Sequence, residues 1–156
     1  MTDVKELIKR FSQLKSQRGT WDSHWQEIAD YVLPRRADVT VKRAKGDKRT
    51  EKIYDSTAIN AAELLASSLH GMLTNAASPW FSMSYKDRQL NLDDASMEWL
   101  EECTNQMYIV LNRSNFQQEI HELYQDLITF GTAGMIIEKD ETAGLRFSTR
   151  HISEIY

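Results

Sequence analysis

Apolar residues recur three and four positions apart in several successive stretches of this sequence, and this spacing limits the fold more strongly than any other feature. Such residues line one face of an α-helix. The first stripe, over about residues 3–18, consists of Val4, Leu7, Ile8, Phe11 and Leu14. The second stripe consists of Trp21, Trp25, Ile28, Ala29 and Val32. Its helix must end near Pro34, because proline clashes with the preceding helical turn. Gly19 lies between the two stripes, so the pattern predicts two helices or one helix kinked at Gly19.

Three further stripes predict helices in the rest of the chain. They consist of Ile59, Ala62, Leu65, Ala66, Leu69 and Leu73, then Met97, Leu100, Cys103, Met107, Val110 and Leu111, then Phe116, Ile120, Leu123, Tyr124, Leu127 and Ile128. Residues suited to N-terminal capping precede each stripe: Asp55 or Ser56, then Asp93, Asp94 or Ser96, then Ser114 with Gln117. We therefore expect about five helices, with Leu123, Leu127 and the tryptophans Trp21, Trp25 and Trp99 in the core.

Two segments predict extended structure. Near residues 80–85 aromatic and apolar side chains alternate with serines, which is typical of a short strand or extended segment. After a helix C-terminal cap and tight turn at 131–134, residues 135–138 and 145–148 flank the turn-forming segment 140–144 and predict a β-hairpin. The predicted fold class is α+β, mainly α.

Several classes of chemistry find no support in the sequence. The single cysteine, Cys103, cannot form an internal disulfide, and no Cys/His spacing indicates a zinc site. No apolar run approaches the roughly 18 residues of a membrane span, so we expect no membrane partner. The four histidines are scattered, and acidic pairs such as Glu101 and Glu102 point in different directions on a helix. We predict no catalytic residues, no metal ligands and no cofactor.

A basic segment, residues 35–54, interrupts this acidic chain of formal net charge −4. It carries eight cationic side chains against three carboxylates and shows no helical period. Three interpretations remain open: a solvated loop, a surface that faces DNA, or an arm that contacts a neighbouring subunit. The candidate DNA or inter-subunit contacts are Arg35, Arg36, Lys42, Arg43, Lys45, Lys48 and Arg49.

Three stretches, residues 18–36, 52–81 and 114–134, resemble the portal or head-to-tail connector family of short-tailed bacteriophages and occur in the family's order. The most specific elements are Ser78-Pro79-Trp80-Phe81, Ser114-Asn115-Phe116 and the Phe130-Gly131-Thr132-Ala133-Gly134 break. The resemblance covers nearly the whole chain. It implies that residues 1–156 are a single domain or the N-terminal fragment of a larger portal subunit, in its peripheral wing region.

The resemblance also implies a structural role and no enzymatic activity. Portal subunits form a ring, typically a dodecamer, at one capsid vertex, through which DNA is packaged and ejected and to which the tail attaches. The implied partners are further copies of the chain, terminase, capsid or scaffold proteins, tail adaptors and duplex DNA that passes non-specifically. The implied location is the virion, with host cytoplasm during assembly. The alternative is a small non-catalytic DNA-binding module with a basic arm.

Overall fold

The computed structural model describes residues 4–86, 93–142 and 144–156 of the chain. Its elements are α1 (Val4–Val32), the 3-10 helix η1 (Pro34–Arg36), α2 (Thr57–Leu73), α3 (Asp94–Arg113), α4 (Phe116–Phe130), β1 (Gly134–Asp140), β2 (Gly144–Arg150) and the 3-10 helix η3 (Ile152–Glu154). Helices dominate and a two-stranded antiparallel hairpin follows them. The predicted α+β, mainly α, class is confirmed.

Helix α1 runs without a break through Gly19, so the described ranges hold four α-helices where about five were expected. A glycine inside a helix costs only about 1 kcal/mol relative to alanine. Trp21 follows Leu14 by seven positions, which keeps the two predicted stripes in phase on one helix face. The predicted start at residue 3 lies outside the described residues.

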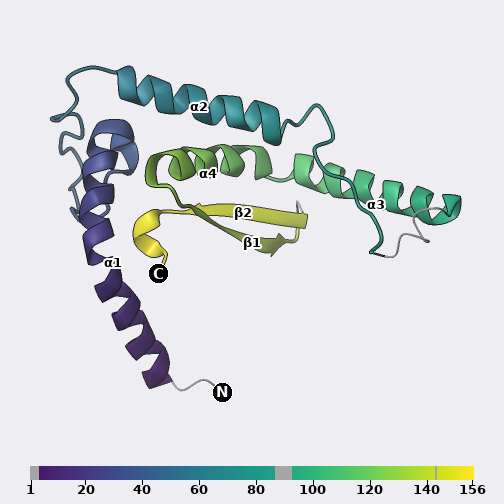
Figure 1. The fold of residues 1–156 in the computed structure, drawn as a ribbon, viewed down its shortest axis with the longest axis horizontal. Coiled ribbons are helices and arrows are strands. Elements are labelled where there is room, and N and C mark those ends of the chain that lie inside the picture. The colour runs from purple at the N-terminus through teal and green to yellow at the C-terminus, as the bar shows by residue number, and fades with distance from the viewer. Residues whose placement is uncertain (1–3, 87–92, 143) are drawn as a thin grey trace.

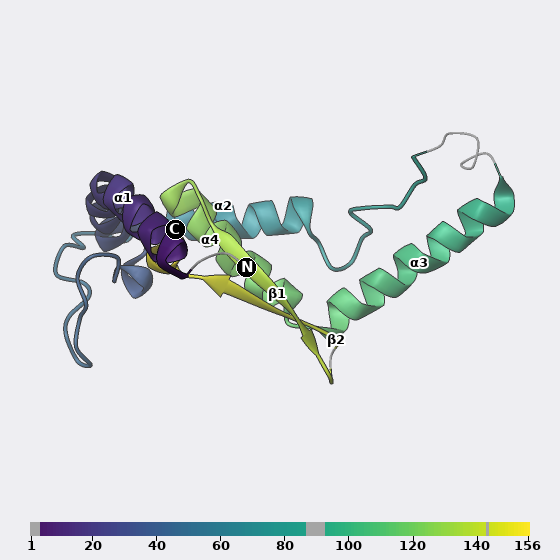
Figure 2. The same cartoon turned by 90° about the horizontal axis from the view of Figure 1, so that it is seen from below.

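The helices and the hairpin form an open arrangement (Figure 1). Helix α2 lies along α4, and α4 packs on the hairpin. Helix α1 crosses one end of these layers and projects beyond them, while α3 extends from the opposite end (Figure 2). The two ends of the molecule therefore carry different elements: α1 and the basic segment at one end, α3 at the other.

The apolar core is small and joins α1 to the end of the chain. It consists of Trp25, Ala29, Ala37, Phe130 and Ile152, with Leu33 and Val39 packed against them. The Trp25 indole N–H donates a hydrogen bond to the Phe130 carbonyl oxygen at 3.1 Å. Residues 105 positions apart in the sequence are thus held together by one side chain.

Burial differs from the sequence prediction at several apolar positions. Trp25 is buried, but Trp21 is 58% exposed and Trp99 is 57% exposed. Leu127 is 41% exposed, and Leu123 is only half-buried. The placement of Trp21, Trp99 and Leu127 in the core was wrong, because a stripe identifies a helix face without showing whether this chain supplies a partner for it.

A second cluster of aromatic side chains joins the predicted motifs. The Trp80 ring stacks on Phe116 with ring centres 5.9 Å apart, and Phe116 meets Phe147 edge-on at 5.1 Å. The Tyr108 hydroxyl accepts hydrogen bonds from the Trp80 and Phe81 amides at 2.7 and 2.6 Å. Residues 80–85 are extended but pair with no strand among the described residues. The Ser-Pro-Trp-Phe element therefore packs within the subunit.

Two helix ends follow the capping residues that the sequence predicts for them. The Asp93 carboxylate accepts a hydrogen bond from the Ser96 amide at 3.0 Å and caps α3 as predicted. Gly131 ends α4 with φ of 75°, in the left-handed region that glycine adopts without a steric penalty. The predicted Ser114 cap is wrong by one position, because the N-cap of α4 is Asn115.

Candidate functional site

The basic segment is held against α1 by the buried side chain of Gln26. Its Oε1 atom accepts hydrogen bonds from the amides of Val39, Thr40 and Val41 at 3.1, 2.9 and 3.2 Å. Its Nε2 atom donates to the Ala37 carbonyl oxygen at 2.5 Å. One amide side chain therefore satisfies four backbone groups of a segment that has little regular structure.

Asp30, one helical turn after Gln26, is a buried carboxylate that forms ion pairs with two cationic side chains. It is 5% exposed and lies 2.7 Å from both Arg43 Nη2 and Lys52 Nζ. Burial by itself raises the pKa of Asp30, but the hydrogen bonds from Lys52 and Arg43 outweigh it and hold the pKa below its ordinary value. Arg43 also contacts Asp38 at 3.2 Å. These ion pairs fix the fold of the basic segment.

A second buried carboxylate, Asp126 of α4, faces the start of the basic segment. It is 1% exposed, and its Oδ2 atom lies 3.0 Å from Arg36 Nη2. Burial raises the pKa of Asp126 to about 6, against the opposing effects of Arg36 and His151. Arg36 also pairs with Glu122 at 3.1 Å, and its carbonyl oxygen lies 2.7 Å from His151 Nε2. Arg36 thus joins η1, α4 and the chain end.

The structure divides the predicted contact residues into two groups. Arg36, Arg43 and Arg49 form ion pairs within the chain, Arg49 with Asp38 at 2.7 Å. Four form no ion pair among the described residues, namely Arg35, Lys42, Lys45 and Lys48. These four side chains are exposed. Only this second group is available to a partner without breaking an internal contact.

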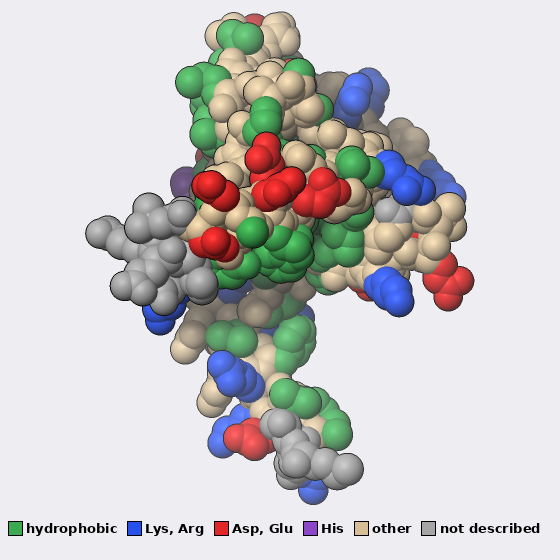
Figure 3. Space-filling view, turned by 90° about the vertical axis from the view of Figure 1, so that its right-hand side faces the viewer, with side chains coloured by type: hydrophobic (Ala, Val, Ile, Leu, Met, Phe, Trp, Pro, Cys, Tyr) green, Lys and Arg blue, Asp and Glu red, His purple; other side chains and the backbone are tan. Residues whose placement is uncertain are grey.

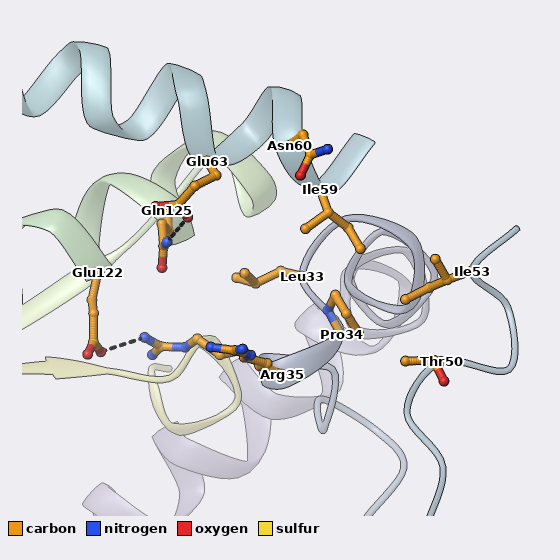
Figure 4. A pocket seen from close by; sticks show the side chains of 11 residues that line it. Leu33, Pro34, Arg35, Thr50, Ile53, Ile59, Asn60, Glu63, Glu122 and Gln125 are labelled. Atoms are coloured by element: carbon orange, nitrogen blue, oxygen red, sulfur yellow. Dashed lines mark hydrogen bonds and ion pairs between the residues drawn. The ribbon is translucent and has the colours of Figure 1, made fainter. Parts of the chain in front are cut away.

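A cavity of about 780 Å³ lies between η1, the basic segment, α2 and α4 (Figure 4). Its apolar side chains include Leu33, Ile53 and Ile59, and its polar side chains include Glu63 and Glu122. Within the part of the chain that the structure describes, no group of three or more His, Cys, Asp or Glu side chains is placed to hold a metal ion. None of the described helices is long and apolar enough to cross a membrane.

The far end of the molecule carries negative charge. Asp94, Glu98, Glu101 and Glu102 are exposed on α3 beside the exposed Trp99 indole. Figure 3 looks onto this end and shows Asp and Glu side chains gathered there. Within the described ranges none of these four carboxylates forms an ion pair with a Lys or Arg side chain. The exposed cations of the basic segment and the exposed carboxylates of α3 therefore lie at opposite ends of the molecule.

Sequence comparison identifies the class of protein. Residues 4–156 match the family described as "Bacteriophage head to tail connecting protein". The chain belongs to this family, which confirms the resemblance carried by its motifs.

Two curated relatives are named as portal proteins or probable portal proteins. The chain is 36% identical over 140 residues to the "Probable portal protein" of Bordetella phage BPP-1, a match that covers 89% of this chain and 25% of the relative. It is 31% identical over 156 residues to the "Portal protein" of Salmonella phage epsilon15, with 99% of this chain and 28% of the relative covered. The chain spans about a quarter of the length of these relatives.

Sequence reasoning missed the buried polar residues that organise the site. Gln26 and Asp30 were not singled out, although they lie next to Trp25 and Ala29 on the second stripe. Polar residues beside a buried stripe at a four-residue spacing are the available signal. Asp126 gave no comparable signal, because its partner Arg36 is 90 positions away in the sequence.

Proposed function

We propose that the chain is the N-terminal, peripheral wing segment of a portal subunit, a structural protein without enzymatic activity. The observation that carries this proposal is the match to the head-to-tail connecting family over residues 4–156, together with two relatives named as portal proteins. The complete subunit forms a closed ring, a dodecamer, at one capsid vertex of the virion. Duplex DNA passes through the ring non-specifically, and the tail attaches to it.

The charge distribution of the chain supports a head-to-tail contact between neighbouring copies. The exposed cations Arg35, Lys42, Lys45 and Lys48 lie at one end, and the exposed carboxylates of α3 lie at the other. A contact between two different surfaces of the same chain generates a ring when the rotation closes. Complementary charge also orients the encounter and opposes wrong pairings. We assign these four cations to the neighbouring subunit, with DNA as the second candidate partner.

The remaining partners follow from the place of a portal in assembly. Terminase supplies the DNA, capsid or scaffold proteins surround the ring, and tail adaptors bind it after packaging. Assembly takes place in the host cytoplasm.

Sedimentation velocity on the 156-residue chain and on the complete subunit tests the proposal. We expect the chain to be monomeric or weakly associated and the complete subunit to form a closed ring. Reversing Glu101 and Glu102 to lysine should weaken ring formation, and reversing Lys45 and Lys48 to glutamate in the same protein should restore it. Lys139→Glu, on an exposed position of β1, is the matched control. A folded complete subunit that stays monomeric at high concentration would contradict the proposal.

A non-catalytic DNA-binding module remains the second candidate, because the same four cations are exposed and without an ion pair among the described residues. A few phosphate contacts give non-specific dissociation constants of about 10⁻⁴ to 10⁻⁶ M at physiological salt. Fluorescence anisotropy with a labelled duplex at two salt concentrations separates the two functions. Nanomolar affinity of the 156-residue chain for one duplex sequence, abolished by Lys42→Gln with Lys45→Gln and Lys48→Gln, would favour the DNA-binding module.

A further inference from the structure

The first half of α1 presents an apolar face that the described chain leaves largely exposed. Its side chains are exposed by 67% at Val4, 54% at Leu7, 61% at Ile8, 47% at Phe11 and 38% at Leu14. They form one stripe of the helix, which we call the α1 stripe. Figure 1 shows this half of α1 projecting past the hairpin.

An isolated helical end of this kind is marginal in water, because most helical stability in proteins comes from packing of an apolar face. The second half of the same helix shows the contrast, since Trp25 and Ala29 are buried in the core. The α1 stripe has the spacing of a buried face, yet its side chains remain 38–67% exposed. A contiguous exposed stripe of large apolar side chains marks an interaction surface.

The last residues of the chain lie directly against this surface. The Tyr156 ring meets the Phe11 ring with centres 4.8 Å apart and lies 3.8 Å from the Arg18 guanidinium carbon. Arg18 Nη1 donates hydrogen bonds to the carbonyl oxygens of Ile152, at 3.0 Å, and Ile155. Three side chains thus fix the position and direction of the backbone where the described chain stops.

We infer that the polypeptide that follows Tyr156 in the complete subunit packs on the α1 stripe and supplies its missing apolar partner. This inference rests on the proposed function, in which the chain is the first segment of a portal subunit. The matched relatives are about four times as long as this chain, so they have ample polypeptide for such a partner.

Geometry favours this occupant over a second copy of the chain. A segment that starts at Tyr156 begins in contact with Phe11, which is itself a member of the α1 stripe. A short tether of this kind raises the local concentration of the segment to about the millimolar range. A neighbouring copy is not tethered next to the α1 stripe. The exposed charges that we assign to contact with a neighbouring copy lie on the basic segment and α3 rather than on the α1 stripe.

Cysteine reactivity with a maleimide tests the inference in the complete subunit. In a Cys103→Ser background, Ile8→Cys reports on the α1 stripe and Arg10→Cys reports on the opposite face of the same helix turn. In the 156-residue chain both thiols should react at similar rates, because both positions are exposed. In the complete subunit Ile8→Cys should react at least about ten-fold more slowly, since a packed thiol reacts only through local opening. Arg10→Cys should keep its rate, and Val4→Cys repeats the measurement at a second position of the stripe.

Comparison of unassembled and assembled complete subunits identifies the occupant. Protection of Ile8→Cys in both states is the expected result. Protection only in the ring would overturn the inference, because the covering surface would then belong to a neighbouring copy, while the proposed portal function would stand. Rapid reaction in both states would also overturn it. A protected thiol in a complete subunit that never forms rings would leave the inference standing and contradict the proposed function.

Discussion

Removing the buried charge of Asp126 should change how the stability of the chain depends on pH. The carboxylate is 1% exposed and lies 3.0 Å from Arg36 Nη2. Burial raises its pKa from 3.8 to about 6. Asp126→Asn keeps the size and shape of the side chain but cannot ionise, so the difference between the two proteins isolates the titration of this one group.

The sign follows from proton linkage. Between pH 4 and pH 6 the folded state binds the Asp126 proton more tightly than the unfolded state, so ionisation lowers the free energy of unfolding as the pH rises. A pKa raised from 3.8 to about 6 corresponds to about 3 kcal/mol, at about 1.4 kcal/mol per pKa unit. This contribution is fully present below pH 3.8 and is lost as the pH passes through about 6. Asp30, whose pKa is lowered, acts in the opposite sense at lower pH and is common to both proteins.

Urea unfolding followed by circular dichroism at pH 4, 5, 6 and 7.5 measures the effect. The free energy of unfolding of Asp126→Asn, relative to the unchanged protein, should rise by about 2.5 kcal/mol across this range, because about 0.5 kcal/mol of the full effect already lies below pH 4. His24→Gln, on α1 and far from Asp126 in sequence, provides a control for general pH effects on the transition. A difference that stays constant within about 0.5 kcal/mol, or that falls with pH, would refute the burial of Asp126.

Three further substitutions test separate contacts. Arg43→Gln should lower the free energy of unfolding by about 1 to 3 kcal/mol in urea, because it removes a cation from the buried Asp30. The control Lys45→Gln, at an exposed position, should change this free energy by less than about 0.5 kcal/mol. Equal losses in the two variants would mean that Arg43 does not stabilise the basic segment. Asn115→Ala should cost about 2 kcal/mol in thermal melts, since its amide donates to the Phe147 carbonyl at 2.8 Å and accepts from the Phe147 amide at 2.9 Å; an unchanged melt would exclude this pairing. Leu127→Ala should cost less than about 1 kcal/mol in the 156-residue chain, since the side chain is 41% exposed, and a loss of 2 to 5 kcal/mol would show that it is buried.

Local features of the fold were predictable from the sequence. The spacing of apolar residues predicted the helices, and capping residues predicted the start of α3 at Asp93 and the end of α4 at Gly131. The turn-forming residues at 140–144 predicted the hairpin. These depend on residues within one helical turn or one strand pair, which is the range over which sequence patterns act. The extra helix in the prediction came from Gly19, whose cost in a helix is small.

Tertiary features were not predictable in the same way. Trp21, Trp99 and Leu127 were expected in the core, yet they are 58%, 57% and 41% exposed in the described chain. The hydrogen bonds from residues 39–41 to Gln26 and the ion pair between Asp126 and Arg36 join separate segments of the chain. A single sequence carries no direct signal for such pairs. The sequence therefore could not decide whether the basic segment is a solvated loop, a surface that faces DNA or an arm that contacts a neighbouring subunit.

Electron cryomicroscopy of the complete subunit is the decisive test of the proposed portal function. We expect closed rings with a central channel, in which the unit formed by α1 to β2 lies at the outer rim and the basic segment of one subunit faces α3 of the next. Complete subunits that are folded but remain monomeric would contradict the proposed function, as would rings in which this unit lines the channel.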